Sequence, residues 1–171
     1  MPQIIFFTIF IFGPIPVVHI LLHSFLKFWQ KHPLYFYLYG AALWAAFIPI
    51  SLFFSKNTSA IFTAPSWLII IAWLTVFSAL FLILWSIKTL GPKKFFLWAV
   101  LKPESIKQER IANGPYRFFR HPAYTAYAAI IIATFLATGY TALLSFSATF
   151  IALILIVIML ENHELSLRLK Q

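Results

Sequence analysis

A chain of 171 residues that is 62% hydrophobic and only 10% charged is too apolar for a water-soluble fold, because soluble domains carry about 25% charged residues. The absence of cysteine excludes disulfides, thiolate metal sites and a catalytic thiol. The formal net charge of +9 does not indicate nucleic acid, because the basic residues cluster beside hydrophobic segments, where anionic lipid headgroups are the usual partner. We therefore expect an all-α, polytopic membrane bundle that forms one integral membrane domain over residues 1–171.

Five hydrophobic segments are long enough to cross a bilayer as helices, since a hydrocarbon core of roughly 30 Å takes about 20 apolar residues. In chain order these predicted spans cover residues 4–26, 34–54, 66–87, 122–138 and 140–160. The stretch from Met1 to Phe12 lacks basic residues, so we interpret it as part of a retained span rather than a cleaved signal peptide. Within this first span, Gly13-Pro14-Ile15-Pro16 predicts a kink or break, because proline removes a helical hydrogen bond.

The thirteen Lys and Arg residues predict the orientation, because cytoplasmic loops carry an excess of them. Only Lys56 falls between spans two and three. The other twelve fall between spans one and two, between spans three and four, or after span five: Lys27, Lys31, Lys88, Lys93, Lys94, Lys102, Lys107, Arg110, Arg117, Arg120, Arg168 and Lys170. We therefore predict an external N-terminus and a cytoplasmic C-terminus.

The longest stretch between spans, Lys88 to His121, holds eight basic residues together with Phe95, Phe96 and Trp98. This mixture is typical of a segment that lies on or partly in the membrane surface. A loop of this length in a small protein is usually functional. We expect residues 88–121 and 161–171 to form a cytoplasmic cofactor segment.

The most informative motif is Gly-Pro-Tyr-Arg-Phe-Phe-Arg-His-Pro-Ala-Tyr at residues 114–124. Pro122 suits the first turn of span four, which places His121 at or near the helix N-cap. The first turn of a helix presents unpaired N–H groups and the positive end of the dipole, and it binds carboxylates and phosphates. Arg117 and Arg120 add donors and charge, and Gly114-Pro115 provides a turn before them. The motif therefore predicts an anion-receiving pocket.

Two of the four carboxylates in the chain belong beside this motif. The uncharged turn Thr138–Thr141 predicts a hairpin of spans four and five, which brings Glu161 and Glu164 next to residues 117–124. These glutamates are i and i+3 on one helix face, and they need partners because a helix C-terminus disfavours negative charge. Anion donors on one wall and carboxylates on the other suit a zwitterionic ligand with an amino-acid moiety and ribose hydroxyls.

The motif, followed about 40 residues later by a glutamate-bearing helix end, resembles the isoprenylcysteine carboxyl methyltransferase and phospholipid methyltransferase superfamily. The resemblance covers residues 90–168, and members are small multispan proteins that use S-adenosylmethionine. It implies methyl transfer to a lipophilic acceptor: an isoprenylcysteine-like carboxylate, a phospholipid amine, or a small lipophilic thiol or amine. In such an in-line displacement the cofactor carries the reactivity, and the protein supplies positioning.

The resemblance also implies roles for individual residues. His121 and Tyr124 would line the cofactor pocket, Tyr116 and Arg117 would shape it with Gly114, Pro115 and Pro122, and Glu161 and Glu164 would hold polar groups of the cofactor. Apart from the resemblance, if the acceptor needs deprotonation, His121 or His163 could serve, because imidazole titrates near neutral pH. Arg117 or Arg120 would neutralise an acceptor carboxylate or phosphate.

Two departures from the family pattern stand out. The family commonly has adjacent glutamates followed by Phe-Gly and tyrosines, whereas here Asn162-His163 separates the glutamates. Either glutamate can therefore be the functional one. No such tail follows before Gln171, so we expect the contacts of that tail to be missing.

Three alternatives remain at this stage. An NADPH-dependent reductase of the sterol-reductase type shares the Arg-His-Pro-x-Tyr block, but it usually shows an Arg-Asp-Glu helix and a Lys-Tyr-Gly-x-x-Trp tail that are absent here. A non-catalytic lipid-binding protein would bind neither cofactor. Finally, His19 and His23 at i and i+4 could ligate a metal or haem, but without a third ligand we expect a hydrogen-bonded pair or separate polar contacts, and no metal site.

Overall fold

The structure is a computed structural model that describes residues 2–105 and 111–168, with only the backbone described at residues 167 and 168. Several residues that the orientation argument counts lie outside the described part: Lys107, Arg110 and Lys170, together with the side chain of Arg168.

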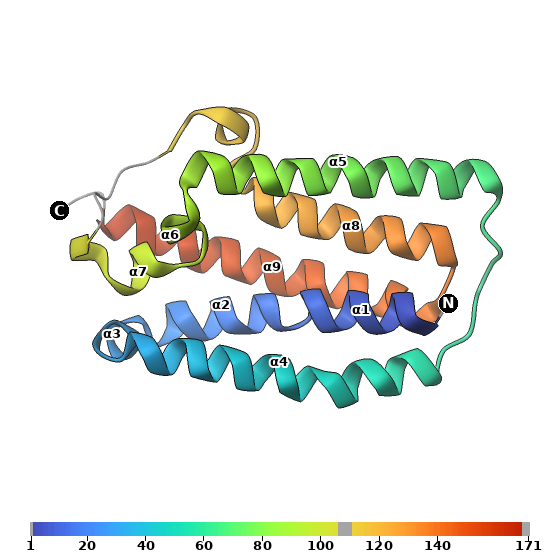
Figure 1. The fold of residues 1–171 in the computed structure, drawn as a ribbon, viewed down its shortest axis with the longest axis horizontal. Helices are drawn as coiled ribbons and strands as arrows, with labels where there is room; N and C mark the ends of the chain where they lie inside the picture. The colour runs from blue at the N-terminus through green and yellow to red at the C-terminus, as the bar shows by residue number, and fades with distance from the viewer. Residues whose placement is uncertain (1, 106–110, 169–171) are drawn as a thin grey trace.

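The fold is a bundle of helices that run lengthwise side by side (Figure 1). The long elements are α1 (Pro2–Phe12) with α2 (Pro14–Ser24), α4 (Pro33–Lys56), α5 (Ser66–Leu90), α8 (Pro122–Thr138) and α9 (Thr141–Arg168). Within residues 2–105 and 111–168, the only β pairing is a single bridge between Ala60 and Tyr140. In the same described residues, four segments are long and apolar enough to cross a membrane, and α8 is a shorter apolar helix of 17 residues. The predicted all-α membrane bundle is confirmed.

The predicted spans agree with these helices to within a few residues except at the end of the fifth. There, α9 continues beyond residue 160, where the expected span ended. No glycine or proline interrupts residues 161–168, and Glu, Leu and Arg are strong helix formers. The extension carries Glu161 and Glu164 on a continuous helix, which fixes where their side chains point.

The first span is broken at Gly13, as its sequence predicts. Helix α1 ends at Phe12 and α2 begins at Pro14, while the Gly13 amide still donates to the Ile9 carbonyl at 2.8 Å. The rings of Pro14 and Pro16 remove two amide donors from the following turn. The two halves stay end to end along one side of the bundle (Figure 1).

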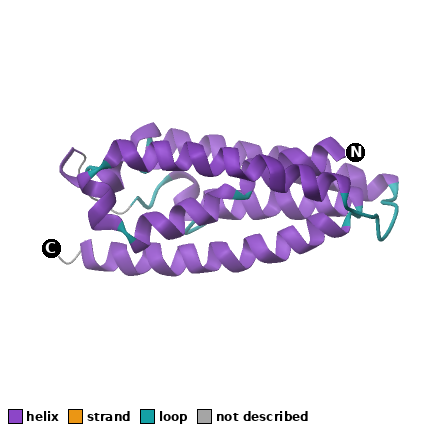
Figure 2. Cartoon of the chain, turned by 90° about the horizontal axis from the view of Figure 1, so that it is seen from below, coloured by secondary structure: helices purple, strands orange, loops and turns teal. Residues whose placement is uncertain are grey.

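The predicted hairpin of α8 and α9 is also present. Gly139 ends α8 with a positive φ of 69°, and its amide donates to the Phe135 carbonyl at 2.7 Å. The α4–α5 connection pairs with this turn: the Ile61 amide donates to Gly139 at 2.8 Å, and the Thr141 amide donates to Ser59 at 3.0 Å. Figure 2 shows this connection at the same end of the bundle as the N-terminus. The start of α8 and the end of α9 therefore meet at the other end.

Short helices close that second end. They are α3 (Leu26–Lys31), α6 (Pro92–Phe95), α7 (Trp98–Leu101), and the 3-10 turns η1 (Pro103–Ser105) and η2 (Gly114–Arg117). Leu101 is fully buried against Val18, Leu22 and Phe36. Gln30 Nε2 donates to the Val100 carbonyl and Tyr37 Oη donates to the Phe96 carbonyl, both at 3.0 Å. The described part of segment 88–121 is thus anchored on the bundle rather than loose at its surface.

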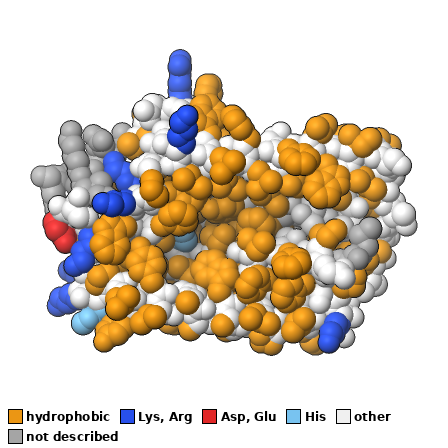
Figure 3. Space-filling model, in the orientation of Figure 1, with side chains coloured by type: hydrophobic (Ala, Val, Ile, Leu, Met, Phe, Trp, Pro, Cys, Tyr) orange, Lys and Arg blue, Asp and Glu red, His pale blue; other side chains and the backbone are white. Residues whose placement is uncertain are grey.

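The surface matches a bilayer environment. Large hydrophobic side chains such as Trp73, Phe77 and Phe81 on α5 are more than half exposed, which a soluble protein rarely tolerates over a wide area. On the face in Figure 3, Lys and Arg side chains gather at the end that holds α3, α6 and α7. Lys56, the last residue of α4, lies at the opposite end (Figure 1). The protein is an integral membrane protein with one strongly basic end.

Candidate functional site

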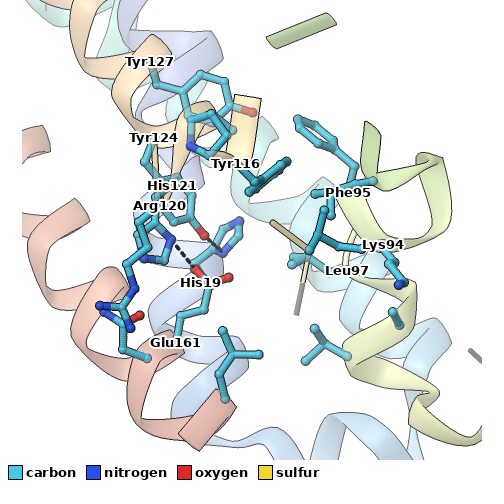
Figure 4. A pocket seen from close by; sticks show the side chains of 18 of the residues that line it. His19, Lys94, Phe95, Leu97, Tyr116, Arg120, His121, Tyr124, Tyr127 and Glu161 are labelled. Atoms are coloured by element: carbon cyan, nitrogen blue, oxygen red, sulfur yellow. Dashed lines mark hydrogen bonds and ion pairs between the residues drawn. The ribbon is translucent and has the colours of Figure 1, made fainter. Parts of the chain in front are cut away.

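A cavity of about 370 Å³ lies at the basic end of the bundle, between the start of α8, the end of α9, α2 and the α6–α7 segment. Its polar lining residues are His19, Lys94, Tyr116, Arg120, His121, Tyr124, Tyr127, Glu161, Asn162 and Ser166. Apolar residues complete the wall, among them Leu90, Phe95, Leu97, Val100 and Leu165. In Figure 4, His121, Tyr124 and Glu161 face this space from one side, while Phe95 and Leu97 face it from the other.

His121 and Glu161 join the two stretches that the sequence analysis brings together. His121 directly precedes Pro122, the first residue of α8, as predicted. Its Nδ1 lies 3.4 Å from Oε2 of Glu161 on α9, with side chains 12% and 29% exposed. This is an ion-pair approach rather than an aligned hydrogen bond, because Oε2 has no hydrogen-bond partner among the described residues. The pair places a carboxylate beside the N-terminus of α8.

Tyr124 lines the cavity from the first turn of α8. It is 8% exposed, and its hydroxyl shares a hydrogen bond of 2.9 Å with Nδ1 of His19. Its ring lies nearly parallel to that of His121, with centroids 5.7 Å apart and an angle of 16° between the planes. Tyr124 therefore connects α2 to the His121–Glu161 pair.

Three polar atoms at the cavity are buried without a hydrogen-bond partner in the part of the chain that the structure describes. They are Nε2 of His121, Oε2 of Glu161 and Oδ1 of Asn162. Buried polar atoms in native proteins are nearly always partnered, and the exceptions call for an explanation. A polar ligand in the cavity would satisfy all three.

These residues fall within a family match. The phospholipid methyltransferase family matches residues 67–167, which is more than half of the chain. The chain belongs to this family. The match covers α5, α8 and nearly all of α9, and it includes every residue that lines the cavity except His19. Comparison with curated proteins and with solved structures found no match. Family membership makes the chain a membrane methyltransferase and agrees with the resemblance that residues 114–124 carry.

The cavity gathers six of the residues that the motif analysis predicted for this methyltransferase: Tyr116, Arg120, His121, Pro122, Tyr124 and Glu161. Tyr116 lies on η2, where burial raises the pKa of its hydroxyl to about 12, against the opposing effect of a hydrogen bond with Ser86. The negative charge of Glu161 raises the pKa further. Tyr116 is therefore a neutral phenol that can donate a hydrogen bond at physiological pH.

Four predicted site residues lie outside the cavity lining: Gly114, Pro115, Arg117 and Glu164. Arg117 is exposed, and Pro115 is fully buried. Gly114 has a positive φ of 56°, and a Cβ there would come within 2.5 Å of Thr89 Oγ1, so glycine lets η2 pack on α5. The direct roles predicted for these four residues in the methyltransferase stay predictions.

Glu164 has a different neighbour from Glu161. It pairs with Nδ1 of His23 on α2, and the two side chains are only 4% (His23) and 12% (Glu164) exposed. His19 and His23 thus make separate polar contacts, with Tyr124 and Glu164 respectively. The sequence kept this alternative open, but it did not assign either histidine to the site.

Sequence reasoning missed five polar residues of the cavity in this family member: His19, Lys94, Tyr127, Asn162 and Ser166. A signal for His19 was present, because an ionisable residue inside an apolar span usually marks a functional site. Asn162 follows Glu161 directly. Lys94 lies on α6, and Gly91-Pro92 indicates the turn before this helix but not that the helix folds onto the cavity.

Proposed function

We propose that the protein transfers a methyl group from S-adenosylmethionine to a lipophilic acceptor that reaches the cavity from the bilayer. The observation that carries this proposal is the convergence of the α8 start and the α9 end on one cavity whose polar atoms lack partners among the described residues. Membership in a methyltransferase family supplies the reaction class.

The residues present fit S-adenosylmethionine. A cavity of about 370 Å³ falls in the range of roughly 300–1,000 Å³ for small-molecule sites. Glu161 Oε2 and Asn162 Oδ1 can accept hydrogen bonds from an ammonium group and from ribose hydroxyls. Arg120 can attract the carboxylate of the same ligand.

The aromatic lining suits the charge of the cofactor. The rings of Tyr116, Tyr124 and Tyr127 all face the cavity. Aromatic faces stabilise cations, and a sulfonium is a cation whose charge is lost when its methyl group leaves. When bound, S-adenosylmethionine supplies an electrophilic methyl group, so the protein needs to orient the acceptor and to exclude water.

For an amine or thiol acceptor, which loses a proton when it is methylated, we assign His121 to take that proton; a carboxylate acceptor needs no such base. The sequence left His121 and His163 as alternatives, but His163 is exposed and does not line the cavity. Nε2 of His121 is buried and has no partner among the described residues, while Nδ1 faces Glu161. A carboxylate at Nδ1 stabilises the imidazolium that forms when Nε2 accepts a proton.

The acceptor we propose is lipophilic: an isoprenylcysteine-like carboxylate, a phospholipid amine, or a small lipophilic thiol or amine. Leu90, Leu97, Val100 and Leu165 form an apolar part of the cavity wall. Figure 3 shows a hollow, rimmed by hydrophobic side chains with a histidine at its floor, towards the basic end. We place this end in the cytoplasm, with the N-terminus outside, because basic residues favour the cytoplasmic face and anionic lipid headgroups.

A methylation assay tests the proposal. Purified protein in lipid nanodiscs is incubated with methyl-labelled S-adenosylmethionine and a total lipid extract, and we expect label in the lipid fraction with the protein but not without it. Calorimetry with each cofactor separates the alternatives. Binding of NADPH without S-adenosylmethionine would support a reductase, and binding of neither would support a lipid-binding protein.

A further inference from the structure

A histidine of the first span enters the cavity although it lies outside the family match, which covers residues 67–167. His19 belongs to α2, whose other residues are apolar apart from His23 and Ser24. Placing an imidazole inside a membrane-spanning helix costs free energy, so such residues usually have a functional partner. His23 has one in Glu164, whereas His19 lines the cavity.

The contacts of His19 lead directly to the proposed centre. Its Nδ1 and the Tyr124 hydroxyl share a hydrogen bond of 2.9 Å, and the two rings meet edge to face with centroids 5.5 Å apart. The ring of His121 also stacks on the ring of Tyr124, with a distance of 5.7 Å between the ring centroids. Figure 4 shows the series running from His19 through Tyr124 to His121 and Glu161.

Tyr124 depends on His19 for its orientation. Tyr124 is 8% exposed, and its hydroxyl has two hydrogen-bond partners, Nδ1 of His19 at 2.9 Å and the carboxylate of Glu161. Without His19 the buried hydroxyl keeps only the Glu161 carboxylate, so the phenol is expected to turn towards that single partner. Because His121 stacks on the same ring, a turn of Tyr124 would move His121 relative to Glu161.

Resting on the proposed function, we propose that His19 is a positioning residue: through Tyr124 it holds the imidazole of His121 at the angle that methyl transfer needs. His19 acts through Tyr124 and not by contact with the reacting atoms. The first span, which the family match does not reach, would in this way complete the active site built by α8 and α9.

Two substitutions separate the hydrogen bond from ring packing. His19→Phe keeps a ring against Tyr124 but removes the hydrogen bond, and His19→Asn keeps a polar atom near the position of Nδ1. We expect His19→Phe to lower kcat about tenfold, with a change below about threefold in KM for S-adenosylmethionine. We expect His19→Asn to recover most of the activity. His32→Phe is the matched control, because His32 is exposed between α3 and α4.

Two further measurements exclude a merely structural role. In the double variant with Tyr124→Phe, His19→Phe should add little to the loss caused by Tyr124→Phe alone, because Tyr124→Phe already removes the hydrogen bond to His19. The side-chain nitrogen resonances of His121, observed by NMR without cofactor, should shift in His19→Phe and in Tyr124→Phe but not in His32→Phe.

The outcomes are distinguishable. A wild-type protein without methyl transfer overturns the proposed function and this inference together. An active wild type with unchanged kcat and unchanged His121 resonances in His19→Phe overturns only the role of His19. Fully additive losses in the double variant, or a fall in thermal midpoint that accounts for the whole loss in His19→Phe, would likewise overturn it.

Discussion

Nδ1 of His121 lies 3.4 Å from Oε2 of Glu161, although the two residues are separated by most of two membrane helices. The hairpin turn at Gly139 lies at the far end of the bundle, so the start of α8 and the end of α9 return to one place. The contact therefore follows from the hairpin, and both residues line the cavity. Substitutions of His121 or Glu161 should therefore weaken ligand binding more than they lower the stability of the fold.

The two glutamates of α9 should differ in their effect on cofactor binding. Glu161 lines the cavity and Glu164 does not. We expect Glu161→Gln to weaken S-adenosylmethionine binding about tenfold or more, because it removes the charge that faces the ligand. Glu164→Gln should change affinity by less than about threefold. Calorimetric titration of both variants measures this, and equal loss in the two would contradict the assignment.

Glu164→Gln should instead reduce stability. Its partner His23 is 4% exposed, and removing the charge of one member of a buried pair is strongly destabilising. Each 1 kcal/mol lowers the melting midpoint by about 2–4 °C in a chain of this size, so a fall of several degrees is expected. Glu104→Gln is the control, since Glu104 is 69% exposed and lies 3.9 Å from Lys102. Equal midpoints in the two variants would count against a stabilising His23–Glu164 pair.

Tyr116 should make stability fall at alkaline pH. Burial raises its pKa to about 12, above the ordinary value of 10.0, so between these values the unfolded chain releases a proton that the folded protein retains. The unfolded state is then favoured as pH rises, and the loss is complete above the folded pKa. Thermal midpoints at pH 8 and pH 11 should therefore differ less in Tyr116→Phe than in the wild type. An identical difference in both proteins would show that Tyr116 does not contribute.

Gly139→Ala should weaken the hairpin. Gly139 has φ of 69°, and a Cβ there would lie 2.2 Å from the Phe62 carbonyl oxygen, so alanine is both strained and blocked. We expect a lower melting midpoint than in the wild type. Gly40→Ala is the matched control, because no atom lies within 4 Å of a Cβ at that helical position. That variant should be neutral or slightly stabilised, since alanine is the better helix former. A Gly139→Ala midpoint at or above that of Gly40→Ala would argue against the strained turn.

Much of the fold is predictable because the lipid environment simplifies it. Apolar runs of about 20 residues leave few alternatives to helices, and the proline pair after Gly13 locates the break in the first span. The hairpin follows from the short uncharged turn Thr138–Thr141. The apolar span was predicted to end at residue 160, and α9 runs on to Arg168 because helix propensity continues through the polar residues, which is consistent with the prediction that Glu161 and Glu164 share a helix.

The site is only partly readable from sequence. The grouping of His121, Tyr124 and Glu161 follows from the motif and the hairpin, but the rotation of α9 decides that Glu161 and not Glu164 faces the cavity. Residues at i and i+3 lie on the same side of a helix. In the structure, however, Glu164 meets α2 through His23, whereas Glu161 meets the start of α8 through His121. The place of His19 likewise depends on how α2 packs against α9 and not on any local pattern.

The central claim is that the stretches around His121 and Glu161 bind one S-adenosylmethionine molecule between them. Ultraviolet crosslinking of labelled S-adenosylmethionine to the protein in nanodiscs, followed by peptide mapping, tests it most directly. We predict label on both residues 114–124 and residues 161–166, displaced by excess unlabelled cofactor. Label confined to other segments, or no displaceable label at all, would contradict the account.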